Sequence, residues 1–407
     1  MKMKRLSLAV ALGTVFAAPA AMAQSSVQLY GKLYPYLLHE KGSGATGPTE
    51  PVSTLAGTHT GVNALTGTKT MNSGNSNIGF RGTEDLGGGM KARFQLEAQL
   101  SVDSGTGAAT GGGLMFNRNT FVGLDGFWGS VKLGNMDTIF KNYGETIGIL
   151  GLSSGTFLSS SGVTRKVGFG TSGASSFHLR RTNSVQYETP EFGGFQGGLQ
   201  WSTNEAKTEV PSRDPRLLSM GVKWDNGPLY VALMHEIHYD LFGGSANAPS
   251  SMRNNGATDP TRSKDRATEV TVEWRLNKQH KFEFDAIRKE YKEDATVAGR
   301  FQSYRNMAYM VAMENRWTDK IRTAAHFALS KSGSCTRVAA ACSTEGLDGK
   351  KFTLAGAYYL SKRTYLFAAG SLIRNDKSAR YTNTENGTHP NPGEDIKHFA
   401  IGVSHNF

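Results

Sequence analysis

Three short stretches of this 407-residue chain match motifs that carry catalytic or nucleotide-binding chemistry. Residues 42–47 match G-x-G-x-x-G, but they lie in a low-complexity stretch without the helix pattern that a dinucleotide site needs. Residues 151–155 match the G-x-S-x-G turn of serine hydrolases, yet the helical crossovers of that fold are missing. Residues 235–238 are not the H-E-x-x-H pair of zinc proteases. The motifs therefore predict neither an enzyme nor a cofactor or metal site.

The charged side chains instead recur at every second position of extended stretches. In residues 90–100, Met, Ala, Phe and Leu alternate with Lys91, Arg93, Gln95, Glu97 and Gln99. A period of two is that of a β-strand, whereas a helix would scatter these charges around its axis. The same alternation recurs at 77–81, 130–134, 195–202, 269–276, 321–330 and 398–407.

Composition and charge exclude several classes of protein. After residue 23 no stretch has the ~18 consecutive apolar residues of a membrane-spanning helix. Two cysteines exclude a disulfide-dense scaffold. The formal net charge is +11, but the basic residues alternate along strands instead of forming one patch, which argues against nucleic-acid binding.

The first 23 residues read as an export signal. Lys2, Lys4 and Arg5 precede an apolar run, and Ala-Met-Ala ends at residue 23. We expect a cleaved signal peptide at 1–23 and a single domain at 24–407. Export permits a disulfide, so Cys335 and Cys342 are interpreted as one bridge that pins a loop. The alternative, a metal pair, lacks nearby His or acidic ligands at suitable spacing.

Turn spacing predicts the number of strands. Seven short turns, near 84–89, 126–129, 190–194, 225–228, 277–280, 317–320 and 361–364, alternate with eight longer Gly/Ser/Asn-rich stretches. This pattern predicts an all-β fold, a 16-stranded antiparallel transmembrane β-barrel with short periplasmic turns and long extracellular loops. A soluble β-sandwich would show similar alternation, but the export signal, the loop asymmetry and the strand count favour the closed barrel.

Several stretches carry a family resemblance: VQLYGK at 27–32, IGFRGTEDLGGG at 78–89, RNTFVGL at 118–124 with VKLG at 131–134, NSVQY at 183–187 with FGG at 192–194, and the final HNF. Together they resemble the Gram-negative general porins, of the trimeric sort common in β-proteobacteria. The resemblance implies a homotrimer in the bacterial outer membrane, in contact with outer-membrane lipid and lipopolysaccharide. It also implies that the barrel-assembly machinery reads the terminal Phe407, and that small hydrophilic solutes and ions pass through without catalysis or a cofactor.

The longest inter-strand segment is 137–179, and the resemblance implies that this third loop folds into the barrel and forms a constriction. Its apolar residues are poor candidates for a solvated loop: Ile147, Ile149, Leu150, Leu152 and Phe157. A mobile external loop is the alternative at this point.

Basic strand residues should face the lumen, because Arg or Lys on the lipid face near the midplane costs ~2–4 kcal/mol. The candidates with lumen parity are Lys32, Arg81, Lys91, Arg93, Arg118 and Arg180. In the family a ladder of wall arginines faces acids on the third loop, and Arg118 and Arg180 match two of its positions. Asn77 occupies a third ladder position, and Asp137 and Glu145 are the only carboxylates in 137–179.

The excess of wall cations over loop acids predicts a weakly to moderately anion-selective channel for passive diffusion, because charges within about a Debye length, ~8–10 Å, are incompletely screened. Any single arginine could also be a solvated lumen charge without a role in selectivity. A solute-selective channel with a saturable site is an alternative, since Tyr30, Tyr34 and Tyr36 share the parity of Lys32. An outer-membrane barrel enzyme would need an outward Ser/His/Asn or Asp/His cluster at one rim, which these residues do not assemble.

Overall fold

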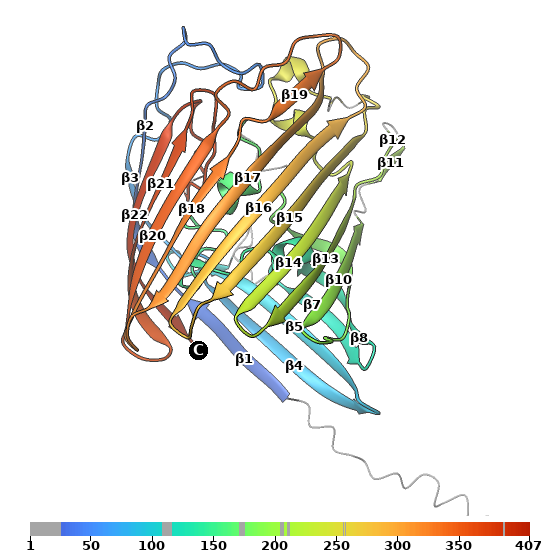
Figure 1. Cartoon of the computed structure of the whole chain (residues 1–407), viewed down its shortest axis with the longest axis vertical. Helices are drawn as coiled ribbons and strands as arrows, with labels where there is room; N and C mark the ends of the chain where they lie inside the picture. The colour runs from blue at the N-terminus through green and yellow to red at the C-terminus, as the bar shows by residue number, and fades with distance from the viewer. Residues whose placement is uncertain are drawn as a thin grey trace, which may run out of the picture.

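The computed structural model describes residues 26–107, 116–170, 176–203, 207–209, 212–254, 256, 258–385 and 387–407. The expected signal peptide, 1–23, lies outside the described residues. The described strands form one antiparallel sheet that closes on itself, with a separate two-stranded ribbon of β11 (Thr208–Glu209) and β12 (Ser212–Arg213) (Figure 1).

Sixteen strands form the wall, and the first two are interrupted. The first is β1 (Ser26–Leu33) continued by β2 (Tyr36–Ser43), and the second is β3 (Thr68–Asn72) continued by β4 (Asn77–Gly87). The remaining wall strands are β5 (Met90–Ser101), β7 (Thr120–Gly126), β8 (Gly129–Asp137), β9 (Arg180–Glu188), β10 (Phe195–Thr203), β13 (Arg216–Asn226), β14 (Leu229–Tyr239), β15 (Ser263–Arg275), β16 (His280–Glu293), β17 (Phe301–Arg316), β18 (Ile321–Ser330), β20 (Gly349–Tyr359), β21 (Thr364–Asn375) and β22 (Asp395–Asn406). Short pieces in the loops are β6 (Thr106–Gly107), β19 (Ser334–Arg337), η2 (Gly244–Asn247) and η3 (Ser250–Met252).

The barrel closes between its last and first strands. Along β22, Gly402 pairs with Tyr36 of β2, and Asn406 pairs with Lys32 of β1. Pro35 separates β1 from β2, because proline has no N–H to contribute to the ladder. The predicted 16-stranded antiparallel barrel is confirmed.

The two ends of the barrel differ. Short turns join the strands at one end and long loops join them at the other (Figure 1). At the β4–β5 turn three successive glycines, Gly87, Gly88 and Gly89, have φ of 79°, 61° and 80°. These angles lie in the left-handed region that glycine tolerates without steric cost, which explains the Gly-Gly-Gly in the turn.

Each wall strand presents different chemistry to its two sides. On β16, Phe282 and Phe284 are exposed, whereas Glu283 and Asp285 between them are buried. The outward side is apolar because it meets hydrocarbon, and the inward side is polar because it meets water or other polar groups. Among the described residues, none of the helices has the length and apolar character needed to cross a membrane.

Candidate pore-lining site

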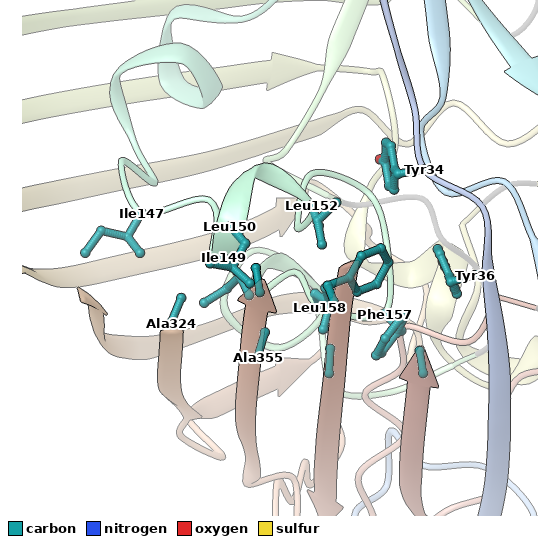
Figure 2. Packing of buried hydrophobic residues seen from close by; sticks show 14 of the residues in the cluster. Tyr34, Tyr36, Ile147, Ile149, Leu150, Leu152, Phe157, Leu158, Ala324 and Ala355 are labelled. Atoms are coloured by element: carbon teal, nitrogen blue, oxygen red, sulfur yellow. The ribbon is translucent and has the colours of Figure 1, made fainter. Parts of the chain in front are cut away.

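The third long loop joins β8 to β9 and packs against the inner surface of the wall. It contains α2 (Ile139–Tyr143), η1 (Ile149–Gly151) and α3 (Ser161–Thr164). Its large apolar side chains are buried: Ile147, Ile149, Leu150, Leu152, Phe157 and Leu158. They pack on inward alanines of β17 to β22, which are Ala312, Ala324, Ala328, Ala355, Ala357, Ala369 and Ala400 (Figure 2). Small wall residues leave the volume that the loop side chains fill at the density of a protein interior.

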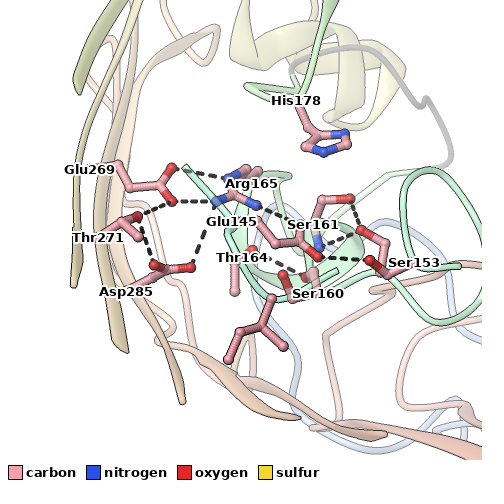
Figure 3. A network of polar contacts seen from close by, with 12 residues as sticks. Glu145, Ser153, Ser160, Ser161, Thr164, Arg165, His178, Glu269, Thr271 and Asp285 are labelled. Carbon is pink, nitrogen blue, oxygen red and sulfur yellow. Dashed lines mark hydrogen bonds and ion pairs between the residues drawn. The ribbon is translucent and has the colours of Figure 1, made fainter. Parts of the chain in front are cut away.

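A buried cation ties the loop to the wall. Arg165 follows α3, and its guanidinium binds both carboxylate oxygens of Glu269 on β15, with Nε 3.0 Å from Oε2 (Figure 3). The same group lies 3.2 Å from Glu145 Oε2 and 3.8 Å from Asp285 Oδ2. Burial alone would lower the pKa of Arg165, but these three carboxylates raise it above its ordinary value. The guanidinium is therefore charged and fully paired inside the barrel.

Wall side chains also satisfy the backbone of the loop. Glu283 on β16 accepts hydrogen bonds from the N–H groups of Thr146, at 2.9 Å, and Ile147. The buried ammonium of Lys351 on β20 donates to the carbonyls of Phe157, at 2.5 Å, and Ser159, at 2.7 Å. A buried loop needs such partners because it has few neighbouring strands with which to pair its polar backbone.

A second lysine reinforces this attachment. Lys289 on β16 donates to the Lys166 carbonyl at 2.6 Å. Side chains of β15, β16 and β20 thus hold the third loop in place. The alternation in the sequence predicts that these side chains face inward, but it does not predict that they bind the loop. The two-residue alternation of the strands could have identified these side chains as candidates. Glu269, Asp285, Lys289 and Lys351 all fall on inward-facing positions.

Three of the predicted wall cations have carboxylate partners. Arg118 pairs with Glu97 of β5, and Arg93 lies 3.1 Å from Asp125. Arg180 lies 3.1 Å from Asp137 Oδ1, at the start of the third loop. These pairs compensate part of the positive charge on the wall of β5 to β9.

The other three predicted cations have no carboxylate within 4.0 Å in the part of the chain that is described. Lys32 donates to the Gly151 carbonyl at 2.5 Å, so the tip of the loop reaches β1. Arg81 donates to Gln28 at 2.9 Å and is exposed, and Lys91 is exposed near the short-turn end. These three side chains retain an uncompensated positive charge.

The arrangement of acids differs from the ladder that the resemblance implied. Glu145 does not face the wall arginines, because Arg165 of the same loop occupies it. The partner of Arg118 is Glu97 on the neighbouring strand and not a loop acid. Asp137 is the one third-loop acid that meets a predicted wall arginine, Arg180, among the described residues. Arg118 pairs with Glu97 because this inward-facing carboxylate lies beside it on the wall.

The tyrosines considered for a solute path serve other contacts. Tyr30 donates its hydroxyl to Glu97 at 3.0 Å. Tyr34 is buried and its hydroxyl accepts the N–H of Asn75, and Tyr36 is buried with its ring 5.6 Å from that of Phe157. These rings brace the third loop and the second strand instead of lining an open path.

Two further sequence candidates are the cysteine pair and the terminal phenylalanine. Cys335 and Cys342 form a disulfide with their Cα atoms 5.7 Å apart. The terminal Phe407 exchanges backbone hydrogen bonds with Gly31 of β1, at 3.0 and 3.1 Å. Within the described ranges, no group of three or more His, Cys, Asp or Glu side chains is arranged to hold a metal ion.

The family model for Gram-negative porins matches residues 7–378 of the chain. The chain belongs to the Gram-negative porin family. Outer membrane porin protein 32 of Delftia acidovorans is 32% identical to this porin over 232 residues, which are 55% of the chain and 57% of the relative. An outer membrane porin protein of Bordetella pertussis is 31% identical over 256 residues, 60% of the chain and 61% of the relative. The chain thus spans less than two thirds of the length of these relatives.

Solved structures show the same fold as this porin. The anion-selective porin from Comamonas acidovorans superposes with a TM-score of 0.69 at 21% identity, covering 94% of this chain and 100% of that one. OmpT of Vibrio cholerae superposes with a TM-score of 0.61 at 15% identity over 94% of this chain and 98% of that one. The porin is a multi-pass protein of the bacterial outer membrane.

Proposed function

We propose that this porin is a passive channel for small hydrophilic solutes and ions, with weak anion selectivity and no catalytic role. The observation that carries the proposal is the asymmetric interior. The third loop is fastened to the wall from β13 to β22, and basic side chains line the wall from β1 to β9. This division supports a polar path between the loop and the basic wall, with residues 137–179 as the constriction.

The charge balance supports weak selectivity. Arg93, Arg118 and Arg180 are each compensated by a carboxylate, whereas Lys32, Arg81 and Lys91 are not. In a narrowed pore the wall lies within about one Debye length, ~8–10 Å, of a permeating ion. Three uncompensated cations then favour anions without excluding cations.

We also propose a homotrimer. The outward faces of β1, β7 and β8, which belong to the stretch of wall from β1 through β4 and β5 to β8, carry exposed apolar side chains: Val27, Leu29, Val122, Leu124 and Leu133. An apolar barrel face can pack against lipid or against another barrel. Recognition of Phe407 by the barrel-assembly machinery belongs to the same proposal, and its side chain is 37% exposed at the end of the chain.

A liposome-swelling assay tests passive diffusion. We expect swelling rates with uncharged sugars to fall steadily with solute size and to rise linearly with concentration. Saturation with one sugar, absent for others of the same size, would favour a solute-selective channel instead. Chemical cross-linking of the purified protein in detergent tests the trimer, and a ladder that ends at the monomer would contradict it.

A further inference from the structure

A polar pocket lies between the third long loop and the last long loop, residues 376–394 between β21 and β22. It has a volume of about 240 Å³, and the described residues that line it come from these two loops. Among its polar side chains are Ser161, Lys166, Ser176 and His178 of the third loop, with Thr384 and Glu385 of the last loop. Figure 3 shows His178 on the same stretch of the third loop as Ser161. The pocket is therefore separate from the basic wall of β1 to β9.

Hydrogen bonds hold the two loops together around the pocket. The side-chain amide of Asn383 donates to the carbonyls of Thr156, at 3.2 Å, and Ser159, at 2.7 Å. The backbone N–H of Phe157 donates to Glu385 Oε1 at 2.5 Å. The walls of the pocket are thus fixed before a ligand arrives, which lowers the cost of ordering them on binding.

Lys166 brings an unpaired charge to the pocket. Within the described ranges its ammonium has no carboxylate partner and no hydrogen-bond acceptor, although its side chain is half-buried. Burial lowers the pKa of Lys166, because an ammonium is less stable away from water. An anion bound beside this group would supply the missing partner and offset the cost of its burial.

His178 adds a neutral donor and acceptor near this charge. Burial lowers the pKa of its imidazole well below the usual range, and the nearby cations Lys141, Arg165, Lys166 and Arg180 lower it further. A neutral imidazole carries one N–H donor and one acceptor nitrogen. In the part of the chain that the structure describes, neither ring nitrogen of His178 has a hydrogen-bond partner. The positive potential and the free N–H both suit a carboxylate.

The last-loop side of the pocket is suited to hydroxyl groups. Burial raises the pKa of Glu385, and its carboxyl group already accepts the N–H of Phe157. Thr384 donates its hydroxyl to the Thr388 carbonyl at 2.6 Å, and its oxygen can still accept a hydrogen bond. This side therefore offers acceptors for neutral O–H donors, whereas the third-loop side attracts a negative charge.

We propose that the pocket binds a small hydroxylated carboxylate such as an aldonic acid, with its carboxylate on Lys166 and His178 and its hydroxyl groups on Ser176, Thr384 and Glu385. A volume of about 240 Å³ holds about eight water molecules at ~30 Å³ each, which is room for an acid of about six carbons. The inference rests on the proposed function and names one class of solute that the channel retains.

Calorimetric titration of the purified full-length protein in detergent with gluconate, at neutral pH, tests the site. We expect Lys166→Gln to bind gluconate at least about tenfold more weakly than the unaltered protein, because it loses a hydrogen bond between two charged groups. The matched control is Lys207→Gln, which removes the same charge from an exposed position in the loop between β10 and β13 and should bind normally. Equal affinity of the two variants would overturn the proposal.

Three further ligands test the unaltered protein and so do not depend on how a variant folds. Glucose has the size of gluconate without its carboxylate, hexanoate has the carboxylate without hydroxyl groups, and norleucine carries an ammonium in their place. Each should bind at least about tenfold more weakly than gluconate. Glucose or hexanoate binding as tightly as gluconate would contradict the proposal, and tighter binding of norleucine would show an amino-acid site instead.

Single-channel recording of the same preparation separates the pocket from the channel. Stepwise openings without measurable gluconate binding would overturn the proposed site and leave the proposed function intact. Gluconate binding without openings would support the site and contradict the proposed function.

Discussion

Arg165 of the third loop and Glu269 of β15 form a two-point ion pair inside the barrel, with Nε 3.0 Å from Oε2 and a second contact through the terminal nitrogen. Both side chains are almost completely shielded from solvent, with exposures of 1% and 0%. The pair joins the tightly packed part of the loop to the wall. It fixes the side of the barrel on which the loop lies, and therefore the side on which a path is free.

Removing the cation of this pair should loosen the loop. Arg165→Gln would leave Glu269 and Asp285 as neighbouring buried carboxylates, and breaking a buried pair in this way costs roughly 3–5 kcal/mol. We expect a lower free energy of unfolding in guanidinium chloride and larger current fluctuations in single-channel recordings. Arg216→Gln is the control, because its pair with Asp214 is about one third exposed and is worth only ~0–1 kcal/mol. Equal effects of the two substitutions would argue against the anchoring role.

Ion preference should depend on the uncompensated lumen cations. The double variant Lys32→Gln/Arg81→Gln removes two positive charges that no carboxylate within 4.0 Å compensates in the described structure, so its anion-to-cation permeability ratio should fall toward one. Lys41→Gln/Lys397→Gln removes the same charge from the outward face and should leave the ratio unchanged. Reversal potentials in a salt gradient measure both. An unchanged ratio in the first variant would remove these side chains from the selectivity mechanism.

Closure of the barrel should be sensitive to one glycine. A Cβ on Gly31 would lie 2.3 Å from the Phe407 ring and 2.5 Å from the carbonyl oxygen of Asn77 on β4, so Gly31→Val cannot be accommodated without moving β1 or its neighbours. We expect a large loss of the compact, heat-modifiable form on gels. Gly356→Val is the control, because its Cβ has open space within 4 Å. Normal folding of Gly31→Val would show that the β1–β22 junction is less tightly packed than described.

The disulfide should act locally. Cys335 and Cys342 close a short loop, for which the chain-entropy relation gives roughly 2–3 kcal/mol. Replacing both by serine should increase protease cleavage between residues 331 and 348. Single-channel conductance should not change, because the bridge lies in an extracellular loop and not in the third loop. Altered conductance with intact proteolytic resistance would contradict this view.

The strands and turns could be predicted from the sequence because each wall residue faces either lipid or water. That local environment alone determines whether its side chain is apolar or polar. Phe282, Glu283 and Phe284 already show the alternation, and Gly87, Gly88 and Gly89 already mark a tight turn. These signals are local and repeat in each strand, so the number of strands follows from counting them.

The attachment of the third loop could not be predicted in the same way. Arg165 and Glu269 are 104 positions apart, and several inward carboxylates have the same parity as Glu269. Which one meets the loop depends on the path of the loop across the barrel. For the same reason the resemblance predicts a third-loop acid as the partner of Arg118, whereas Arg118 pairs with Glu97 on the next strand.

Single-channel recording of the purified protein across a potassium chloride gradient tests the central claim most directly. We expect stepwise openings with a reversal potential displaced modestly toward the equilibrium potential of chloride, because the free part of the wall carries uncompensated cations. A bilayer that stays silent, or a reversal potential displaced toward that of potassium, would contradict the account.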